Sequence, residues 1–214
     1  MAWFRCTGGN GGGSSSAPEI SGRMGSSGPL FLNGRFYSGI ASQLYAYFPK
    51  TSEGNKPAFD FTKPFKIHMK VKVSGLLSRS QALIGNSANY YNLPSFEFQP
   101  SSSTTLIWAG WSTNGSTWTA SLDIPKSSMA FTANAWYTIE YAWDGSTFTL
   151  TVNDGNATAS ASVATAHFYQ TSSGDVQLGT VSNSSNHYAA NATFDLFDTY
   201  WEQDGTVIWG NKAA

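Results

Sequence analysis

The sequence predicts an all-β protein built as an antiparallel β-sandwich or jelly roll, and three observations support this. Apolar and polar residues alternate with period two in many short runs, as expected of strands with one buried face. Asn-Gly or Asp-Gly pairs, which favour tight hairpin turns, occur at 33–34, 114–115, 144–145 and 204–205. No segment of helical length carries an apolar stripe with period 3.6, so crossover helices are not expected.

The first 28 residues differ in composition from the rest of the chain. A short apolar patch at 1–6 precedes a Gly/Ser-rich run at 7–28, which has too few apolar residues to bury a core. We therefore expect a flexible N-terminal tether at 1–28 and a β-sandwich domain at 29–214. Trp3 and Phe4 are candidate anchors to a larger assembly, and a simply disordered tail is the alternative.

From residue 29 onward nearly every segment has the pattern of a short strand. The clearest runs from Phe65 to Ser74, where apolar residues alternate with lysines and His68. This lysine row is interpreted as a solvated strand face, with an anion-binding ridge as the alternative. Next comes a hairpin at 134–155, with its strands on either side of Asp144-Gly145 and its core face made by Ile139, Tyr141, Trp143, Phe148, Leu150 and Val152. Further strands are expected at 30–37, 40–48, 81–85, 95–99, 104–112, 116–123, 175–180, 193–202 and 205–209, giving about twelve in all.

The composition excludes several classes of function. Charged residues make up 12% of the chain and the net charge is −1, which disfavours binding to nucleic acid or to an anionic membrane. The single cysteine, Cys6, excludes an internal disulfide. No apolar run is long enough for a signal peptide or a membrane span, so we expect synthesis in a bacterial cytoplasm and a later place on the surface of a virus particle.

Three stretches resemble known proteins. The hairpin WYTIEYAWDGSTFTLTVNDG at 136–155 is similar to that of the concanavalin A-like lectin/glucanase superfamily, especially its laminin-G-like branch. The stretch ATFDLFDTYWEQDGTVIWG at 192–210 resembles the closing strands of such domains in phage and prophage structural proteins, and MAWFRCTGGNGGG resembles the start of prophage virion proteins. The resemblance covers about residues 29–210. It implies a concanavalin A-like jelly roll in a virion protein, in a superfamily that contains enzymes, lectins and adhesion modules.

Catalysis and metal binding are not expected. The clustered carboxylates of laminarinase-type enzymes are absent, and Glu97 with Glu140 is the pair that could still face each other across a concave sheet, as in jelly-roll hydrolases. We favour the interpretation that both are ordinary residues of polar strand faces. The three histidines have no metal-ligand spacing, and Leu196 stands where the similar strand of legume lectins has an acid, so no metal or cofactor is predicted.

Aromatic residues in loop-like contexts are the candidate ligand-binding residues, because rings stack on the apolar faces of sugars. In the run 104–112, Trp108 and Trp111 fall on opposite faces, so one should be buried and the other more exposed. For each ring, packing in the core is the alternative. The candidates are Trp111, Tyr90, Tyr91, Trp118, His187 and Tyr188.

The sequence therefore favours a phage or prophage virion surface module, in a fibre, a tail or a capsid decoration, that binds glycans of the host cell surface or of mucin. Its N-terminus would contact other virion proteins, and a homo-oligomer is compatible with this interpretation. A purely structural decoration protein that makes protein–protein contacts is the first alternative, and a jelly-roll glycoside hydrolase is the second.

Overall fold

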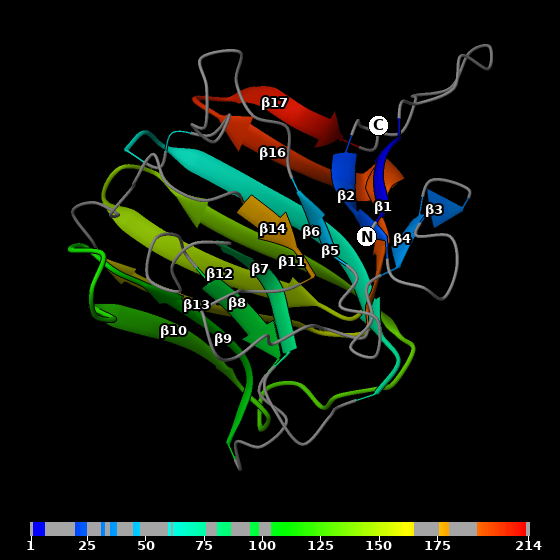
Figure 1. The fold of residues 1–214 in the computed structure, drawn as a ribbon. Helices are drawn as coiled ribbons and strands as arrows, with labels where there is room; N and C mark the ends of the chain where they lie inside the picture. Colours follow the sequence, from blue (N-terminus) through cyan, green and yellow to red (C-terminus); the bar gives the residue numbers. More distant parts are fainter. Residues whose placement is uncertain are drawn as a thin grey trace.

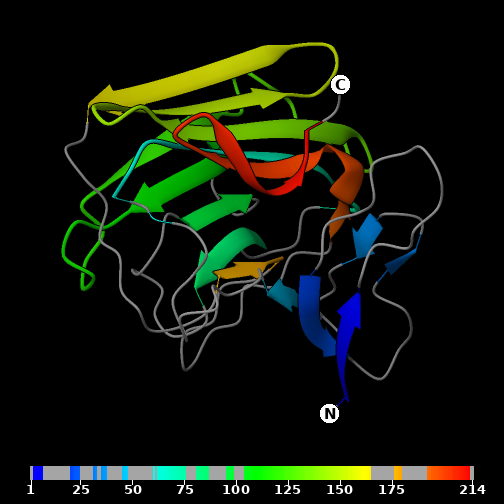
Figure 2. The same cartoon turned by 90° about the horizontal axis from the view of Figure 1, so that it is seen from above.

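A computed structural model of the protein describes residues 2–6, 20–24, 31–32, 35–37, 45–47, 60, 62–75, 81–86, 95–98, 104–164, 176–179 and 192–212. Strands β1 to β17 and a short 3-10 helix, η1, make up the regular structure of these residues. The strands form two antiparallel sheets packed face to face in a β-sandwich (Figure 1, Figure 2). The predicted all-β, antiparallel class is therefore confirmed. Within the described part of the chain, no helix is long and apolar enough to cross a membrane.

The first sheet contains eight strands in the order β1-β2-β5-β14-β7-β8-β9-β10. Three of its hydrogen-bonded pairs, β2-β5, β5-β14 and β14-β7, join strands that are not consecutive in the chain, as expected of a jelly roll rather than a simple meander. The strands are β1 (Ala2–Cys6), β2 (Ile20–Met24), β5 (Tyr45–Tyr47), β14 (Val176–Leu178), β7 (Gln81–Asn86), β8 (Ser95–Phe98), β9 (Thr105–Trp111) and β10 (Ala120–Pro125).

The second sheet has nine strands, seven of them in the order β13-β12-β11-β6-β15-β4-β3. The other two are β16, which also pairs with β6, and β17, which pairs with β16. The strands are β13 (Thr158–Ala164), β12 (Thr147–Asn153), β11 (Trp136–Trp143), β6 (Phe65–Val73), β15 (Ala192–Asp195), β4 (Arg35–Tyr37), β3 (Phe31–Leu32), β16 (Thr199–Gln203) and β17 (Thr206–Asn211).

The core lies between the two sheets and follows the alternation of the sequence. In β6 every second side chain from Phe65 to Val73 is buried, and β11 and β12 repeat this pattern. The predicted hairpin is confirmed, since Trp143 pairs with Phe148 across the turn. The four other residues assigned to its core face are fully buried: Ile139, Tyr141, Leu150 and Val152.

Glycine conformations explain the turns. Gly115, Gly145 and Gly205 have φ angles of 73°, 99° and 76°. These angles lie in the left-handed region of backbone conformation, which residues that carry a Cβ atom rarely adopt. Three predicted turns are therefore confirmed, while Asn33-Gly34 lies outside the described residues.

The segment 193–202, predicted as one strand, is interrupted. Residues Leu196–Asp198 form η1, which divides the segment into β15 and β16. The Asp195 carboxylate accepts the Phe197 N–H at 3.1 Å, and the Thr199 hydroxyl donates to the Asp195 carbonyl at 2.7 Å. These local hydrogen bonds compete with the strand ladder and turn the chain, so Asp198 is placed above β6.

Other strand predictions also differ from the structure. The segment predicted at 116–123 becomes a strand only at Ala120, because residues 112–119 form a loop. β13 was missed, since its sequence TASASVA has no large apolar residues to reveal the alternation. β1 and β2 fall within the predicted tether, yet they pair with each other, and β2 pairs with β5. Residues 7–19 lie outside the described residues, and the domain boundary at 28/29 stays a prediction.

Candidate functional site

Trp111, the first ring proposed for ligand binding, belongs to the core. Its side chain is 1% exposed, and its ring packs on Phe148 of the opposite sheet with centroids 4.9 Å apart. Ile107 and Ala109, on the same face of β9, are also fully buried. The assignment of Trp111 as a binding residue is therefore wrong. Alternation showed that Trp108 and Trp111 face opposite ways, but it did not show which face meets the second sheet.

Trp108 occupies the outward face of β9, where it meets Trp118. The two indole rings are 5.0 Å apart and nearly perpendicular, at 85°. Trp108 lies over Gly110, where any Cβ would overlap its ring, so the indole lies along the strand rather than standing away from it. Both rings are partly exposed. This Trp108–Trp118 pair is a partly exposed aromatic surface on the outer face of the first sheet.

Hydrogen bonds within residues 112–117 order the loop that carries Trp118. The Ser112 hydroxyl accepts the backbone N–H groups of Asn114 and Gly115, at 3.2 and 2.8 Å. The Asn114 side-chain oxygen accepts those of Ser116 and Thr117, at 2.9 and 3.1 Å. These Asx and Ser turns order the loop without help from a ligand. The aromatic surface is therefore arranged before anything binds.

The loop is also joined to the core strand that precedes it. The Thr119 N–H donates to the Trp111 carbonyl at 2.9 Å, and the Thr119 hydroxyl accepts the Thr113 N–H at 2.9 Å. Buried Trp111 thus fixes the base of the loop, while Trp118 at its end remains accessible. The two tryptophans therefore have separate roles in one local structure.

Acidic residues stand on both sides of Trp108 in the sheet. Asp123 of β10 and Glu97 of β8 occupy the positions in register with it on the two neighbouring strands. The side chain of Asp123 is exposed to solvent. Partial burial raises the pKa of the Asp123 carboxyl, while a hydrogen bond with Thr105 opposes that rise. An aromatic surface beside hydrogen-bond acceptors is the arrangement that suits a hydroxyl-bearing ligand.

Glu97 and Glu140 do not form a catalytic pair. Glu97 lies in β8 of the first sheet, and Glu140 lies in β11 of the second. Because Ile139 and Tyr141 on either side of it are buried, Glu140 faces away from the first sheet. The facing arrangement that the sequence left open for a hydrolase is therefore wrong. Glu140 belongs to an outward strand face, as favoured above.

Glu140 instead takes part in a charged network on the outer face of the second sheet. Its Oε1 lies 2.9 Å from His68 Nδ1, and its Oε2 lies 3.9 Å from Lys66 Nζ. The hydrogen bond with His68 is the main cause that lowers the pKa of Glu140. The His68 ring stacks on Tyr200 with centroids 4.7 Å apart, and its Nε2 lies 3.2 Å from Asp198 Oδ1, outside hydrogen-bond geometry.

The lysines of β6 are partnered within this face. Lys66 pairs with Glu140, and Lys70 Nζ lies 3.4 Å from Asp198 Oδ2. The Lys72 ammonium lies 5.2 Å from the centroid of the Trp136 ring. Since each charge already has a local partner, these lysines do not form a free ridge for an anionic ligand. Among the residues that the structure describes, no group of three or more metal-ligating side chains is close enough to hold a metal ion.

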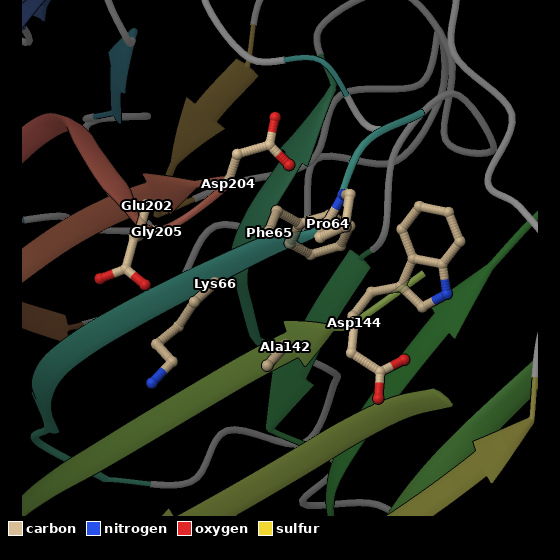
Figure 3. A pocket seen from close by; sticks show the side chains of 9 residues that line it. Pro64, Phe65, Lys66, Ala142, Asp144, Glu202, Asp204 and Gly205 are labelled. Atoms are coloured by element: carbon tan, nitrogen blue, oxygen red, sulfur yellow. The ribbon is translucent and has the colours of Figure 1, made fainter. Parts of the chain in front are cut away.

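A small pocket opens at one end of this face, between the turns that follow β11 and β16 (Figure 3). Its volume is about 210 Å³. In Figure 3, Glu202 and Asp204 lie on one side of the hollow and Asp144 on the other, with Pro64 and Phe65 between them. The full lining is Pro64, Phe65, Lys66, Ala142, Trp143, Asp144, Glu202, Asp204 and Gly205.

The remaining predicted site residues are only partly accounted for. Trp118 belongs to the aromatic surface together with Trp108, which was not among the predicted binding residues. Trp3 and Phe4 lie in β1, and their role as anchors stays a prediction because only their backbone is described. Four candidates lie outside the described residues: Tyr90, Tyr91, His187 and Tyr188.

No protein-family model and no curated protein matches the sequence. Solved structures do share its fold. The enzymatically active domain of tailspike protein 2 of bacteriophage CBA120 matches 91% of this chain and 30% of that one, with a TM-score of 0.55 and 13% identity. The binding domain of botulinum neurotoxin DC, in complex with rat synaptotagmin II, matches 87% of this chain and 45% of that one, with a TM-score of 0.54 and 9% identity.

A third structure concerns botulinum neurotoxin type C, whose cell entry depends on interaction with two ganglioside molecules. It matches 88% of this chain and 44% of that one, with a TM-score of 0.51 and 10% identity. The chain spans less than half the length of each of these proteins. At such low identities the likeness shows a common β-sandwich fold, found in a phage tailspike and in toxin binding domains.

Proposed function

We propose that this protein is a non-catalytic carbohydrate-binding module of the concanavalin A-like type, displayed on the surface of a phage or prophage virion. The observation that carries the proposal is the Trp108–Trp118 pair, a preordered and partly exposed aromatic surface between two acidic strand positions. Indole rings cover the apolar face of a sugar ring at low entropic cost, and neighbouring carboxylates accept hydrogen bonds from its hydroxyls. The ligands would be glycans of the host cell surface or of mucin.

Structural neighbours are in keeping with this proposal without deciding it. One is part of a phage tailspike, and another is a toxin whose cell entry depends on gangliosides. The virion location and the contact of the N-terminus with other virion proteins belong to the same proposal.

Affinity of a single site is expected to be weak. Sugar hydroxyls exchange hydrogen bonds with water for hydrogen bonds with protein, so the net gain for each bond is small. We expect dissociation constants from millimolar to tens of micromolar, which correspond to roughly 4–6.5 kcal/mol. Display in many copies would convert this into firm attachment through effective concentration.

The test compares a monomeric form with a form multimerised on beads, against bacterial surface polysaccharides and mucin glycans. The beads should retain at least one glycan that the monomer binds poorly, and Trp118→Ala should remove the retention. Trp136→Ala, which removes a partly exposed tryptophan of the opposite sheet, is the matched control and should retain the glycan. If multimerised protein ignores every glycan in the panel, the proposal is refuted.

A purely structural role is the second candidate, and a specific feature favours it. Phe197, Val207 and Ile208 are the large apolar side chains that are most exposed in the described part of the chain, at 38–40%. They belong to η1 and β17, and β17 pairs with β16 alone. Such a strand could contact another virion protein. In that case Val207→Lys would impair incorporation into particles, while Trp118→Ala would have no effect on them.

A hydrolase would be recognised by turnover. If the protein released reducing ends from a glycan and Glu97→Gln abolished that release, the assignment as a non-catalytic module would have to be replaced. The control in that assay is Glu140→Gln, because Glu140 lies on the other sheet and is bound to His68. We expect no release from any glycan with the unmodified protein.

A further inference from the structure

The pocket of Figure 3 lies on the opposite sheet from the Trp108–Trp118 pair, and its walls come from three separate segments of the chain. The start of β6 contributes Lys66, the end of β11 contributes Ala142, and the turn after it contributes Asp144. The end of β16 and the turn after it contribute Glu202 and Asp204. The hollow therefore exists only when the hairpin β11–β12 and the hairpin β16–β17 are both packed on β6.

A small side chain creates the hollow. Ala142 lies on the outward face of β11, in register with Lys66 on one side and Thr149 on the other. Because its two cross-strand neighbours are longer, the methyl group of Ala142 leaves a gap in the row. Exposed Pro64 and the methyl group of Ala142 provide apolar lining, whereas Phe65 and Trp143 reach the pocket as core residues that are only 4% and 5% exposed.

The volume fits one small ring. Liquid water occupies about 30 Å³ per molecule, so about 210 Å³ is the space of about seven waters. That is the size of a single sugar ring and too small for a chain of them. A ring placed there would meet apolar contacts on one side and oxygen acceptors on the other, which is how proteins hold polyhydroxylated ligands.

The charged groups that line the pocket limit the class of ligand that it can hold. Three carboxylates line the pocket, those of Asp144, Glu202 and Asp204, against the ammonium of Lys66. Glu202 Oε2 lies 3.1 Å from Lys212 Nζ, and Lys66 is drawn toward Glu140, 3.9 Å away. Even with Lys212 counted, carboxylates outnumber ammonium groups three to two. A ligand with its own carboxylate would face like charge here, whereas hydroxyl or amine donors would find acceptors.

We propose that this pocket is a second sugar site, which takes a single pyranose residue that carries no negative charge. It rests on the proposed function, because it adds a site for a terminal sugar to a module whose aromatic surface would bind along a chain. The two sites lie on the outer faces of opposite sheets. One molecule could therefore hold two glycans at once and contribute to multivalent attachment.

The experiment is a titration of isotope-labelled full-length protein, followed by NMR, with three methyl glycosides that share one ring. Methyl glucoside and methyl glucosaminide should cause saturable shifts at the backbone amides of Ala142, Asp144 and Gly205. Methyl glucuronide should bind at least tenfold more weakly. Equal binding of the glucuronide, or no saturable shift with any of the three, would overturn the proposal.

Two variants test the geometry. Ala142→Val fills the hollow with a residue that strands accept readily, and should abolish the shifts. Its matched control is Thr149→Val on the next strand, which does not line the pocket and should leave the shifts unchanged. Asp204→Asn should raise the affinity for methyl glucuronide several-fold, since Asn tolerates the positive φ of 47° at this position. Unchanged shifts in Ala142→Val would contradict a pocket at this place.

A parallel binding assay with Trp118→Ala separates this proposal from the proposed function. If Trp118→Ala loses retention of polysaccharide while no glycoside perturbs the pocket, the second site is refuted and the proposed function stands. If glycosides bind at the pocket and Trp118→Ala retains polysaccharide fully, the aromatic surface is refuted and the pocket stands.

Discussion

Replacing Trp111 and Trp118 separately by alanine should separate stability from binding. Trp111 is 1% exposed and packs on Phe148 across the sandwich, whereas Trp118 is partly exposed and packs on Trp108. The two residues are seven positions apart and are linked through the backbone of Thr119. The same chemical change should therefore have opposite consequences at two neighbouring places.

The magnitude follows from burial. A buried tryptophan removes about 150–250 Å² from water. At about 25 cal/mol per Å² this amounts to about 4–6 kcal/mol, an upper bound because unfolded chains are partly compact. Measured Trp→Ala costs of about 3–5 kcal/mol agree with that figure, so we expect this loss in the free energy of unfolding for Trp111→Ala. Trp118→Ala loses chiefly one aromatic contact, of about 0.5–1.5 kcal/mol.

Thermal unfolding followed by circular dichroism measures the difference. One kcal/mol shifts Tm by about 2–4 °C in a domain of this size, so Trp111→Ala should lower Tm by about 6–20 °C. At temperatures below its reduced Tm, the multimerised Trp111→Ala variant should still retain glycan. The Trp118→Ala variant should fold normally and lose this retention. A Tm change below about 2 °C for Trp111→Ala would show that the inner face of β9 has been assigned wrongly.

The remaining predictions concern the second sheet. Leu150→Ala should cost about 2–5 kcal/mol in urea unfolding, because Leu150 is fully buried and the hairpin cannot close the cavity. An unchanged midpoint would mean that the hairpin points its other face to the core. Glu140→Gln should cost about 0.2–1 kcal/mol near neutral pH, since its carboxylate is 35% exposed. The pKa of Glu140 is lowered mainly by the hydrogen bond with His68, so its contribution is present above the unfolded pKa of about 4.3 and is lost as pH falls through the lower folded pKa. Unfolding curves of the two proteins should therefore converge under acid conditions, and a constant gap from pH 7 to pH 3 would contradict this cause. Gly145→Ala should destabilise by about 1–2 kcal/mol, because φ at Gly145 is 99°. Gly75→Ala is its control: a Cβ there meets nothing within 4 Å, and equal losses in the two variants would refute the argument from backbone conformation.

Local information in the sequence was enough for the class of fold and for many of its elements. The period-two alternation from Phe65 to Val73 and in the hairpin around Gly145 correctly predicted strands, pairing and buried faces. This works because side chains in a strand point alternately to its two sides, and because a tight turn fixes which residues pair. The same signal was weak in β13, where Thr and Ser alternate mainly with alanine rather than with large apolar residues, and that strand was missed.

The candidate site required the tertiary structure. Alternation in β9 placed Trp108 and Trp111 on opposite faces, and only the packing of the first sheet on the second showed that Trp111 is the buried one. Likewise, Glu97 and Glu140 have similar sequence surroundings, but they lie in different sheets.

The charged network on β6 and the pocket beside Ala142 also join segments far apart in the chain. His68, Glu140 and Asp198 meet only because β11 and the η1 turn both pack on β6. A local pattern specifies the direction of each side chain relative to its own strand, whereas the partner across the sheet is determined by long-range pairing. For β6 and the hairpin β11–β12, the sequence by itself determined the strands and their buried face, whereas for β9 the tertiary structure decided which face was the core and which carried the site.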